Sequence, residues 1–349
     1  MNDHRKTFIA FVKLGSFLKD FCNENPSESE WHNSFSEAIT IAGHKNGWFT
    51  EDNIRFALQG WSELLTEQNL SDWLAVYDVQ SNQPKKVALI LAGNIPLVGF
   101  HDFLSVLITG NSVIAKLSSS DEVLLPLISK YLITIEPSLE SHIGFTKNKL
   151  EDFDAVIATG SNNTARYFEH YFGKGPHIIR KNRNSVAVLS GNETTTQLKA
   201  LGEDIFRYYG LGCRSVSKLF VPKEYDFDTF FKAIYEYNPI IHGAKYANNY
   251  DYNKAVYLMS EFKLLENGFL ILKEDSSYSS PIASLFYETY DSQEGLQEKL
   301  NEDVDKIQCI VADFELENEI AFGATQRPRL SDFADGVDTV DFLLKTSQN

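Results

Sequence analysis

Apolar residues recur at helical spacing in the first part of the chain, up to about Leu74. Phe8, Phe11, Val12 and Leu18 fall on one face of such a helix, and Lys13, Lys19 and Asp20 interrupt the apolar stretch. This spacing predicts an amphipathic first helix rather than a signal peptide. Polar stretches at 23–30 and 43–47 separate it from later helical segments. We therefore expect the chain to open with a group of helices.

From residue 85 onward, short apolar runs alternate with helical patterns. We expect buried strands at 85–93, 110–118, 154–159 and 184–191, and a serine-capped helix at 119–135 that tolerates Pro126. The rhythm restarts with a helix before residue 213, a strand at 217–222, a helix at 227–237 and a strand at 268–275. Alternating strands and helices predict α/β domains with mostly parallel sheets.

This rhythm suggests three parts of the chain. We expect residues 1–190 to hold the N-terminal helices and a first α/β domain, and residues 191–322 to form a second α/β domain. Residues 323–349 would return to the first domain or contribute to an oligomer interface.

Composition narrows the classes of partner. The net charge is −16, which disfavours nucleic acid and anionic membranes, and no apolar stretch is long enough to span a bilayer. The three cysteines, Cys22, Cys213 and Cys309, are too sparse for a disulfide framework or a metal site. We expect a cytoplasmic, metal-free protein.

One basic segment stands out in this acidic chain. Residues 173–183 contain five cationic or titratable basic side chains: Lys174, His177, Arg180, Lys181 and Arg183. A single pocket for a phosphate-bearing small ligand needs only a few cations, so such a ligand fits better than a polymer. By charge alone, a solvated basic loop explains the segment equally well.

Cys213 is the first candidate for chemistry. Gly210 and Gly212 precede it and allow a sharp turn, while Arg214 follows it and would favour the reactive thiolate. A buried structural thiol explains the local sequence equally well, because most cysteines are structural. Cys22 and Cys309 lie in apolar surroundings and are better explained as core residues.

Three further features follow predicted strands. Asn94 comes directly after the strand at 85–93, where its amide could donate into a cleft or act only as the N-cap of a helix that starts near Pro96. Lys116 ends the second strand and could bind a ribose or phosphate. Gly160 and Ser161 open a helix whose N-terminus suits anions, although the GxGxxG fingerprint is absent.

Taken in order, these motifs resemble the aldehyde dehydrogenase superfamily. They are GNIP (93–96), GNSVIAK (110–116), ATGS (158–161) and GLGCRSVSKLFV (210–221). Within it, DIFRYYGLGCRS (204–215) and LSDFADGVDTVDFLL (330–344) resemble acyl-CoA reductases of the LuxC type, the fatty-acid reductase component of bacterial bioluminescence. The resemblance spans Lys85 to Leu344 and implies two doubly wound α/β domains with the active site in the cleft between them.

The resemblance also implies roles for individual residues. Cys213 would accept the acyl group, and Asn94 with the Cys213 N–H would form the oxyanion hole. Lys116 would hold the adenosine ribose or 2′-phosphate of NADPH, with NADH as the alternative, and Gly160 and Ser161 would line the cofactor cleft. The basic segment adds Arg180 and Arg183 as candidate ligands for phosphates of NADPH or CoA.

The departures from the superfamily are informative. Where hydrolytic aldehyde dehydrogenases have a general-base glutamate, this chain has RKNRN (180–184), so Arg180 takes that place. The glutamate that binds the nicotinamide ribose in many members has no counterpart near 277–281. Water attack on a thioester needs an activating base, whereas exchange between thiols does not.

The expected function is therefore reduction of an acyl-CoA, or of another acyl thioester, to the aldehyde. A hydrolytic aldehyde dehydrogenase and a non-catalytic relative acting as a scaffold remain as alternatives. The luminescence reductase works beside a protein that delivers acyl groups, so an acyl-protein donor is a further expected partner. Superfamily analogy also suggests a homo-oligomer, either a dimer or a tetramer.

Overall fold

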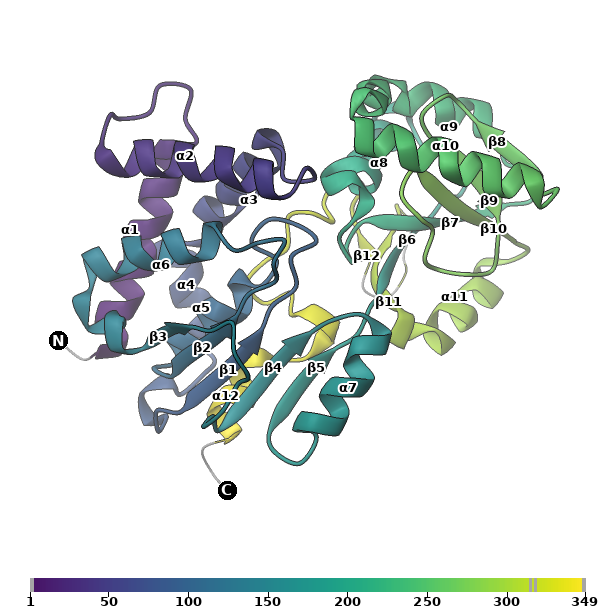
Figure 1. Ribbon diagram of the computed structural model, residues 1–349. Coiled ribbons are helices and arrows are strands. Elements are labelled where there is room, and N and C mark those ends of the chain that lie inside the picture. Colours follow the sequence, from purple (N-terminus) through teal and green to yellow (C-terminus); the bar gives the residue numbers. More distant parts are fainter. Residues whose placement is uncertain (1–2, 314–315, 317–318, 347–349) are drawn as a thin grey trace. The chain divides into compact units, whose positions relative to one another are not determined.

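The computed structural model describes residues 3–313, 316 and 319–346. The chain divides into two compact units. The first combines Met1–Lys181 with Arg329–Asn349, and the second is the continuous segment Asn182–Pro328. Figure 1 shows both units as mixed helices and strands.

The first unit begins with the expected group of helices. Side-chain oxygens of Ser29, Thr50 and Thr66 accept hydrogen bonds from backbone N–H groups in the first turns of three of them, which fixes where those helices start. The segments are α1 (Asp3–Phe21), α2 (Glu30–Lys45), α3 (Glu51–Leu64), α4 (Glu67–Leu74) and the short 3₁₀ helix η1 (Val79–Ser81).

A parallel sheet forms the centre of the first unit. Its strands lie in the order β3-β2-β1-β4-β5, so the chain starts at β1, builds outward to β3 and then crosses to the other side. The strands are β1 (Lys86–Ile90), β2 (Ser112–Lys116), β3 (Ile143–Phe145), β4 (Ala155–Thr159) and β5 (His177–Arg180). The helical segments between and after them are α5 (Phe100–Ile108), α6 (Leu124–Ile135), η2 (Pro137–Ser141), α7 (Asn162–Phe172), η6 (Ala334–Gly336) and α12 (Thr339–Lys345).

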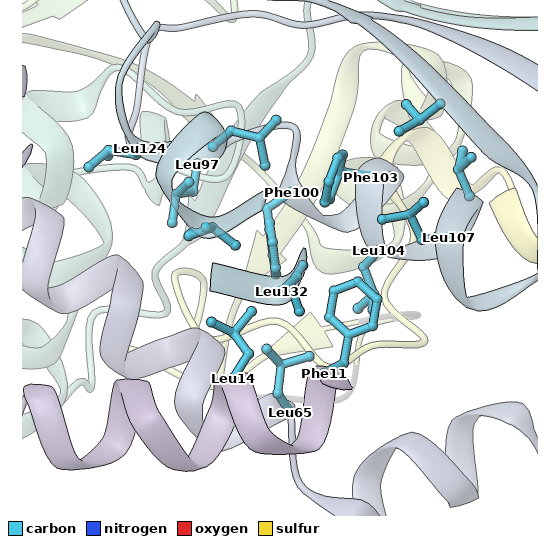
Figure 2. Packing of buried hydrophobic residues seen from close by; sticks show 14 of the residues in the cluster. Phe11, Leu14, Leu65, Leu97, Phe100, Phe103, Leu104, Leu107, Leu124 and Leu132 are labelled. Atoms are coloured by element: carbon cyan, nitrogen blue, oxygen red, sulfur yellow. The ribbon is translucent and has the colours of Figure 1, made fainter. Parts of the chain in front are cut away.

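Both faces of this sheet are covered. Alternate residues such as Val87 and Leu89 join a large core with helices α1, α5 and α6, part of which Figure 2 shows. Ala88 and Val156 point to the opposite face, where α7 contributes Phe168. Burial on both faces explains why these strands read as continuous apolar runs in the sequence.

The second unit contains another sheet, in the order β12-β11-β6-β7-β10-β9-β8, parallel except for the β8–β9 pair. The strands are β6 (Asn184–Val188), β7 (Val216–Pro222), β8 (Leu264–Glu266), β9 (Ile271–Glu274), β10 (Ser284–Tyr290), β11 (Ile307–Val311) and β12 (Glu319–Ile320). The helices are α8 (Thr195–Phe206), η3 (Arg207–Gly210), α9 (Phe227–Ala233), η4 (Ile234–His242), α10 (Ala244–Met259), α11 (Gln293–Glu302) and η5 (Val304–Lys306). Helices α8 and α9 pack with one face, and Leu296 and Leu300 of α11 pack with the other.

The α/β fold class predicted from the sequence is confirmed, while several boundaries differ. Strand β6 pairs with β7 and β11, so the first unit ends at Lys181 and not at residue 190. The helix expected at 119–135 begins at Leu124 without a side-chain cap, which places Pro126 in its first turn. There the missing N–H of proline costs no helical hydrogen bond.

Within residues 3–313, 316 and 319–346, none of the helices combines the length and apolar composition that crossing a bilayer requires.

Candidate active site

Cys213 lies in a turn between η3 and β7 of the second unit. Its thiol is not in a disulfide, and the residue is half-buried. The hydroxyl of Ser185 on β6 donates to the Cys213 carbonyl at 2.9 Å, which ties the turn to the neighbouring strand. Cys309, by contrast, is 3% exposed within β11, as expected of a core residue.

The backbone just before this turn is strained. Tyr208 and Tyr209 both have left-handed backbone angles, with φ of 54° and 58°, and Gly210 follows with φ of 74°. Left-handed geometry costs a residue with a side chain roughly 1–2 kcal/mol, whereas glycine adopts it freely. Burial of Tyr208 and contact between the Tyr209 and Tyr246 rings help to hold this conformation. Such strain concentrates at functional segments.

A buried carboxylate supports the cysteine turn from the other side. Asp204 on α8 is fully buried and accepts from the Thr325 N–H at 2.9 Å, the Thr325 hydroxyl at 2.7 Å and the Gly323 N–H at 2.6 Å. The Thr325 carbonyl in turn accepts from Nε of Arg214, next to the cysteine. Burial raises the pKa of Asp204, while these hydrogen bonds act to lower it. Arg214 is thus anchored by a backbone carbonyl.

The first unit gathers the other predicted residues at one sheet edge. Asn94 follows β1, Lys116 ends β2, and Gly160 and Ser161 follow β4. Because β2, β1 and β4 are parallel neighbours, these positions lie at their common carboxyl-terminal edge. The chain changes direction across the sheet between β1 and β4, and ligands of open α/β sheets bind at such a point.

The structure corrects the reading of Asn94 as a helix cap. Helix α5 begins at Phe100 with Gly99 at its N-cap position, so Asn94 lies in a bend well before the helix. Its side chain is exposed at the sheet edge. The exposed bend is compatible with an amide that donates to a ligand.

Lys116 and Ser161 have identifiable contacts at this edge. The Lys116 ammonium donates to the Asn148 carbonyl at 3.3 Å, and the lysine is half-buried. Ser161 caps α7, its hydroxyl accepting from the Thr164 N–H at 3.3 Å. The Gly160–Ser161 turn therefore leads into a helix N-terminus, as the sequence predicted.

Arg180 has a different role from the phosphate-binding one expected. It is 5% exposed, and its guanidinium donates to both oxygens of Asp102 on α5, at 2.6 and 3.3 Å. The same group donates to the Ala334 carbonyl at 2.7 Å and to the Thr339 hydroxyl at 2.9 Å. A guanidinium used in this way binds the C-terminal segment to the sheet, so we do not retain Arg180 as a cofactor ligand.

The other basic residues of 173–183 are divided between the units. Arg183 belongs to the second unit and donates to the Val304 and Ile307 carbonyls, both at 3.3 Å. Lys181 ends the first unit and pairs on its surface with Glu169 at 2.9 Å. These contacts stabilise β5 and β11 locally and provide no support for a phosphate site.

Comparison with known families identifies the chain. The model of the family described as "Acyl-CoA reductase (LuxC)" matches residues 44–236, more than half of the sequence. The chain belongs to the LuxC acyl-CoA reductase family. It is accordingly an oxidoreductase of the LuxC type, as the motifs predicted. No curated protein sequence matches it significantly.

Solved structures extend the likeness of this LuxC-family chain to the whole fold. Aldehyde dehydrogenase 21 of Physcomitrella patens, in complex with the reaction product succinate, has a TM-score of 0.67 at 11% identity, over 99% of this chain and 85% of that one. The Mycobacterium tuberculosis aldehyde dehydrogenase complexed with NAD⁺ gives 0.63 at 11% identity, over 91% and 79%. An aldehyde dehydrogenase from Bacillus cereus, also an NAD⁺ complex, gives 0.60 at 12% identity, over 91% and 78%. The aldehyde dehydrogenase fold is thus confirmed for this LuxC-family protein.

Sequence reasoning missed three buried carboxylates near the LuxC motifs: Asp102, Asp121 and Asp204. Asp102 offered a signal, because it is the lone acidic residue in the apolar helix FHDFLSVLI. A charge there requires a buried partner. Asp121 and Asp204 lie beside other acidic residues in the sequence, and such acidic pairs are typical of a solvent-exposed surface.

Proposed function

We propose that this protein reduces acyl thioesters, and acyl-CoA first among them, to aldehydes through an acyl-enzyme on Cys213. One observation carries the proposal: residues 44–236, matched by the acyl-CoA reductase family model, contain a single cysteine, Cys213. That cysteine is not in a disulfide and lies in a supported turn, whereas Cys22 and Cys309 fall outside the matched region.

In this proposal, the Cys213 thiolate attacks the thioester carbonyl carbon. A carbon–sulfur bond forms to Cys213, and the tetrahedral oxyanion accepts hydrogen bonds from the Asn94 amide and the Cys213 N–H. The bond to CoA then breaks, and CoA leaves as a thiolate that takes a proton from water. Each oxyanion donor of this kind is typically worth about 3–4 kcal/mol of transition-state stabilisation.

A reduced nicotinamide would supply the hydride that converts the acyl-enzyme to a thiohemiacetal. Cys213 then leaves that adduct as thiolate, releasing the aldehyde. The first unit suits such a dinucleotide, because a cation (Lys116), a hydroxyl (Ser161) and the N-terminus of α7 follow adjacent parallel strands. The Mycobacterium tuberculosis and Bacillus cereus relatives are NAD⁺ complexes, which supports a nicotinamide cofactor here. We expect NADPH, with NADH as the alternative.

The position of Arg180 bears on the fate of the acyl-enzyme. The residue standing where hydrolytic relatives have a general base is a buried arginine paired with Asp102, and it has no capacity to accept a proton from water. Thiolates are good nucleophiles and leaving groups, so acyl exchange with CoA proceeds without a base. This favours thioester reduction over hydrolysis of an aldehyde to an acid.

The direct test follows NADPH oxidation with acyl-CoAs of graded chain length while the aldehyde is trapped. Without NADPH, mass spectrometry should find the acyl group on the peptide that contains Cys213. We expect Cys213→Ala to abolish both signals and Asn94→Ala to lower turnover about a hundredfold or more. Cys22→Ala and Asn33→Ala, which change residues of the N-terminal helical segment, should behave like the wild type.

Appreciable acyl-CoA reduction by Cys213→Ala would overturn the mechanism. The reverse reaction separates the alternatives. A hydrolytic aldehyde dehydrogenase would convert aldehyde and NAD(P)⁺ to free acid, whereas the proposed enzyme needs CoA and yields acyl-CoA. A scaffold would show no saturable binding of NADPH. Substituting an acylated protein for acyl-CoA tests whether a partner delivers the acyl group.

A further inference from the structure

The loop that carries Asn94 contains a strained residue. Between β1 and α5, Leu97 has a φ of 58°, a left-handed conformation that is unfavourable for leucine. Its side chain is 4% exposed and belongs to the large core of the first unit, where Figure 2 shows it close to Leu124 and Phe100. Burial of the side chain alone does not hold the Leu97 backbone in the left-handed conformation, so another contact must stabilise it.

That contact is a buried carboxylate. Oδ2 of Asp121 accepts from the Leu97 N–H at 3.1 Å. Asp121 is 8% exposed, and its Oδ1 has no hydrogen-bond partner within the described residues. A buried carboxylate with an unsatisfied oxygen is costly for folding. Its presence therefore requires an explanation other than stability.

The same contact connects two loops of the candidate site. Leu91 donates its N–H to the Lys116 carbonyl at 3.0 Å. A Cβ added at Gly93 would lie 2.8 Å from the Ser118 side chain, closer than real Cβ atoms approach their neighbours, and a tight 3.2 Å from the Asp121 nitrogen. The loop with Asn94 and the segment after Lys116 are thus packed against each other along residues 91–97 and 116–121.

We propose that Asp121 is a positioning residue that holds Leu97 in its left-handed conformation. By holding Leu97, it keeps the Asn94 amide in position for the oxyanion and keeps the loop packed against the segment that follows Lys116. The inference rests on the proposed function only in assigning the oxyanion to Asn94. The hold of Asp121 on Leu97 is independent of that assignment.

This arrangement makes the loop sensitive to pH. Burial raises the pKa of Asp121 to about 6, and a protonated carboxyl is a weaker acceptor for the Leu97 N–H than a carboxylate. Charged groups on the elements around it are engaged elsewhere: Asp102 binds Arg180, while Glu122 pairs with Lys45 and Lys147. On α5, the ring of His101 lies against the Leu330 carbonyl, and burial lowers the pKa of this histidine. Asp121 is thus the group that would release the loop as the pH falls through 6.

Two substitutions of Asp121 test the proposal. Asp121→Ala removes the acceptor for the Leu97 N–H, whereas the amide oxygen of Asp121→Asn can still accept but does not titrate. We expect Asp121→Ala to lower kcat for acyl-CoA reduction at least tenfold, with the KM changed less than about threefold. Asp121→Asn should keep most of the kcat at pH 7.5 and lose the decline that the wild type shows between pH 7 and 5. Glu122→Gln, the matched neighbouring control, should keep the wild-type profile.

Hydrogen exchange of residues 91–99 supplies a readout that does not depend on activity. Asp121→Ala should speed exchange in this segment while α1 and α3 stay protected, and acidification from pH 7 to 5 should shift wild-type protection relative to Asp121→Asn. Unchanged exchange in Asp121→Ala, a wild-type kcat in that variant, or identical pH profiles for wild type and Asp121→Asn would each overturn the proposal. If the wild type has no reductase activity, the proposed function fails, while hydrogen exchange still decides whether Asp121 holds Leu97.

Discussion

The guanidinium of Arg180 and the carboxylate of Asp102 form a two-point ion pair inside the first unit, with both side chains less than a tenth exposed. Asp102 belongs to α5, and Arg180 ends β5 at the edge of the sheet. The pair therefore fixes a helix that covers the sheet to a strand far away in sequence. Hydrogen bonds from the same guanidinium to Ala334 and Thr339 add the C-terminal segment to this junction.

Arg180→Ala should destabilise the first unit rather than weaken cofactor binding. It leaves the Asp102 charge buried without its partner, a change that costs about 3–5 kcal/mol in comparable cases. Urea denaturation measures the loss. Lys181→Ala, which breaks an exposed pair with Glu169, should cost less than about 1 kcal/mol. A folded Arg180→Ala variant of wild-type stability, with a raised KM for NADPH, would restore the phosphate-binding role.

Substitutions at Asp204 and Thr325 should change the reactivity of Cys213 without touching the thiol. Both oxygens of Asp204 accept hydrogen bonds from backbone N–H groups. Asp204→Asn replaces one oxygen with an amide NH₂, a donor that faces another donor, and should lower the free energy of unfolding by about 2–3 kcal/mol. Thr325→Val removes only the hydroxyl donor and should cost about 1 kcal/mol.

The rate of Cys213 alkylation by iodoacetamide as a function of pH reports the thiolate. We expect it to change more in Asp204→Asn than in Thr325→Val, and Glu203→Gln is the neighbouring control. Equal alkylation rates in all four proteins would show that this network does not support the turn.

Asp121 also predicts a pH dependence of stability. Its pKa is raised from the ordinary 3.8 to about 6 on folding, so the folded protein binds this proton more tightly than the unfolded chain does. The stability contribution is therefore present below about pH 4 and is lost as the pH rises through 6. A difference of about two pH units corresponds to about 3 kcal/mol. Relative to Asp121→Asn, the wild type should lose up to that amount between pH 4 and 7 in urea denaturation. A difference independent of pH would contradict burial of an ionised Asp121.

Lys116→Ala should weaken cofactor binding while leaving Cys213 acylation intact. Loss of the ammonium removes a hydrogen-bonding cation from the edge of β2, and the KM for the reduced cofactor should rise about tenfold or more. A larger effect on NADPH than on NADH would assign Lys116 to the 2′-phosphate, and equal effects would assign it to the ribose. Lys130→Ala, on the exposed side of α6, is the control. An unchanged KM for both cofactors would remove Lys116 from the site.

The strands around the site could be predicted because they are buried on both faces. Val87–Ile90 and Ala155–Ala158 appear in the sequence as short apolar runs ended by glycine or polar residues, which indicates their type, although β1 ends at Ile90 and not at the predicted Gly93. Asn94, Lys116 and Gly160 each follow a predicted strand, and the parallel pairing of these strands brings them to one sheet edge. The sequence does not indicate helix α10, because its tyrosines and asparagines give no clear apolar stripe.

Backbone conformation and long-range pairing could not be predicted in this way. The sequence around Leu97 and Tyr208 does not indicate a left-handed backbone, because tertiary contacts impose that conformation against the local preference of leucine and tyrosine. The basic neighbours of Arg180 in the sequence favour a role as a phosphate ligand. Its actual partner, Asp102, lies in a distant helix, and only the fold brings the two charges together.

The first unit consists of two segments that are synthesised at different times, one before and one after the second unit. The second unit is one uninterrupted segment, whereas the first is completed by residues from Arg329 onward. Asp102 and Arg180 leave the ribosome before the second unit, but Ala334 and Thr339, their partners at the C-terminal end, emerge only after it. Lys85 and Tyr77 likewise have partners in the C-terminal segment: the Lys85 ammonium donates to the Leu343 carbonyl, and the Tyr77 hydroxyl donates to Asp338. The first unit is thus completed only by residues that follow the second unit in the chain, and the Arg180–Asp102 junction lacks these two partners until Ala334 and Thr339 have been synthesised.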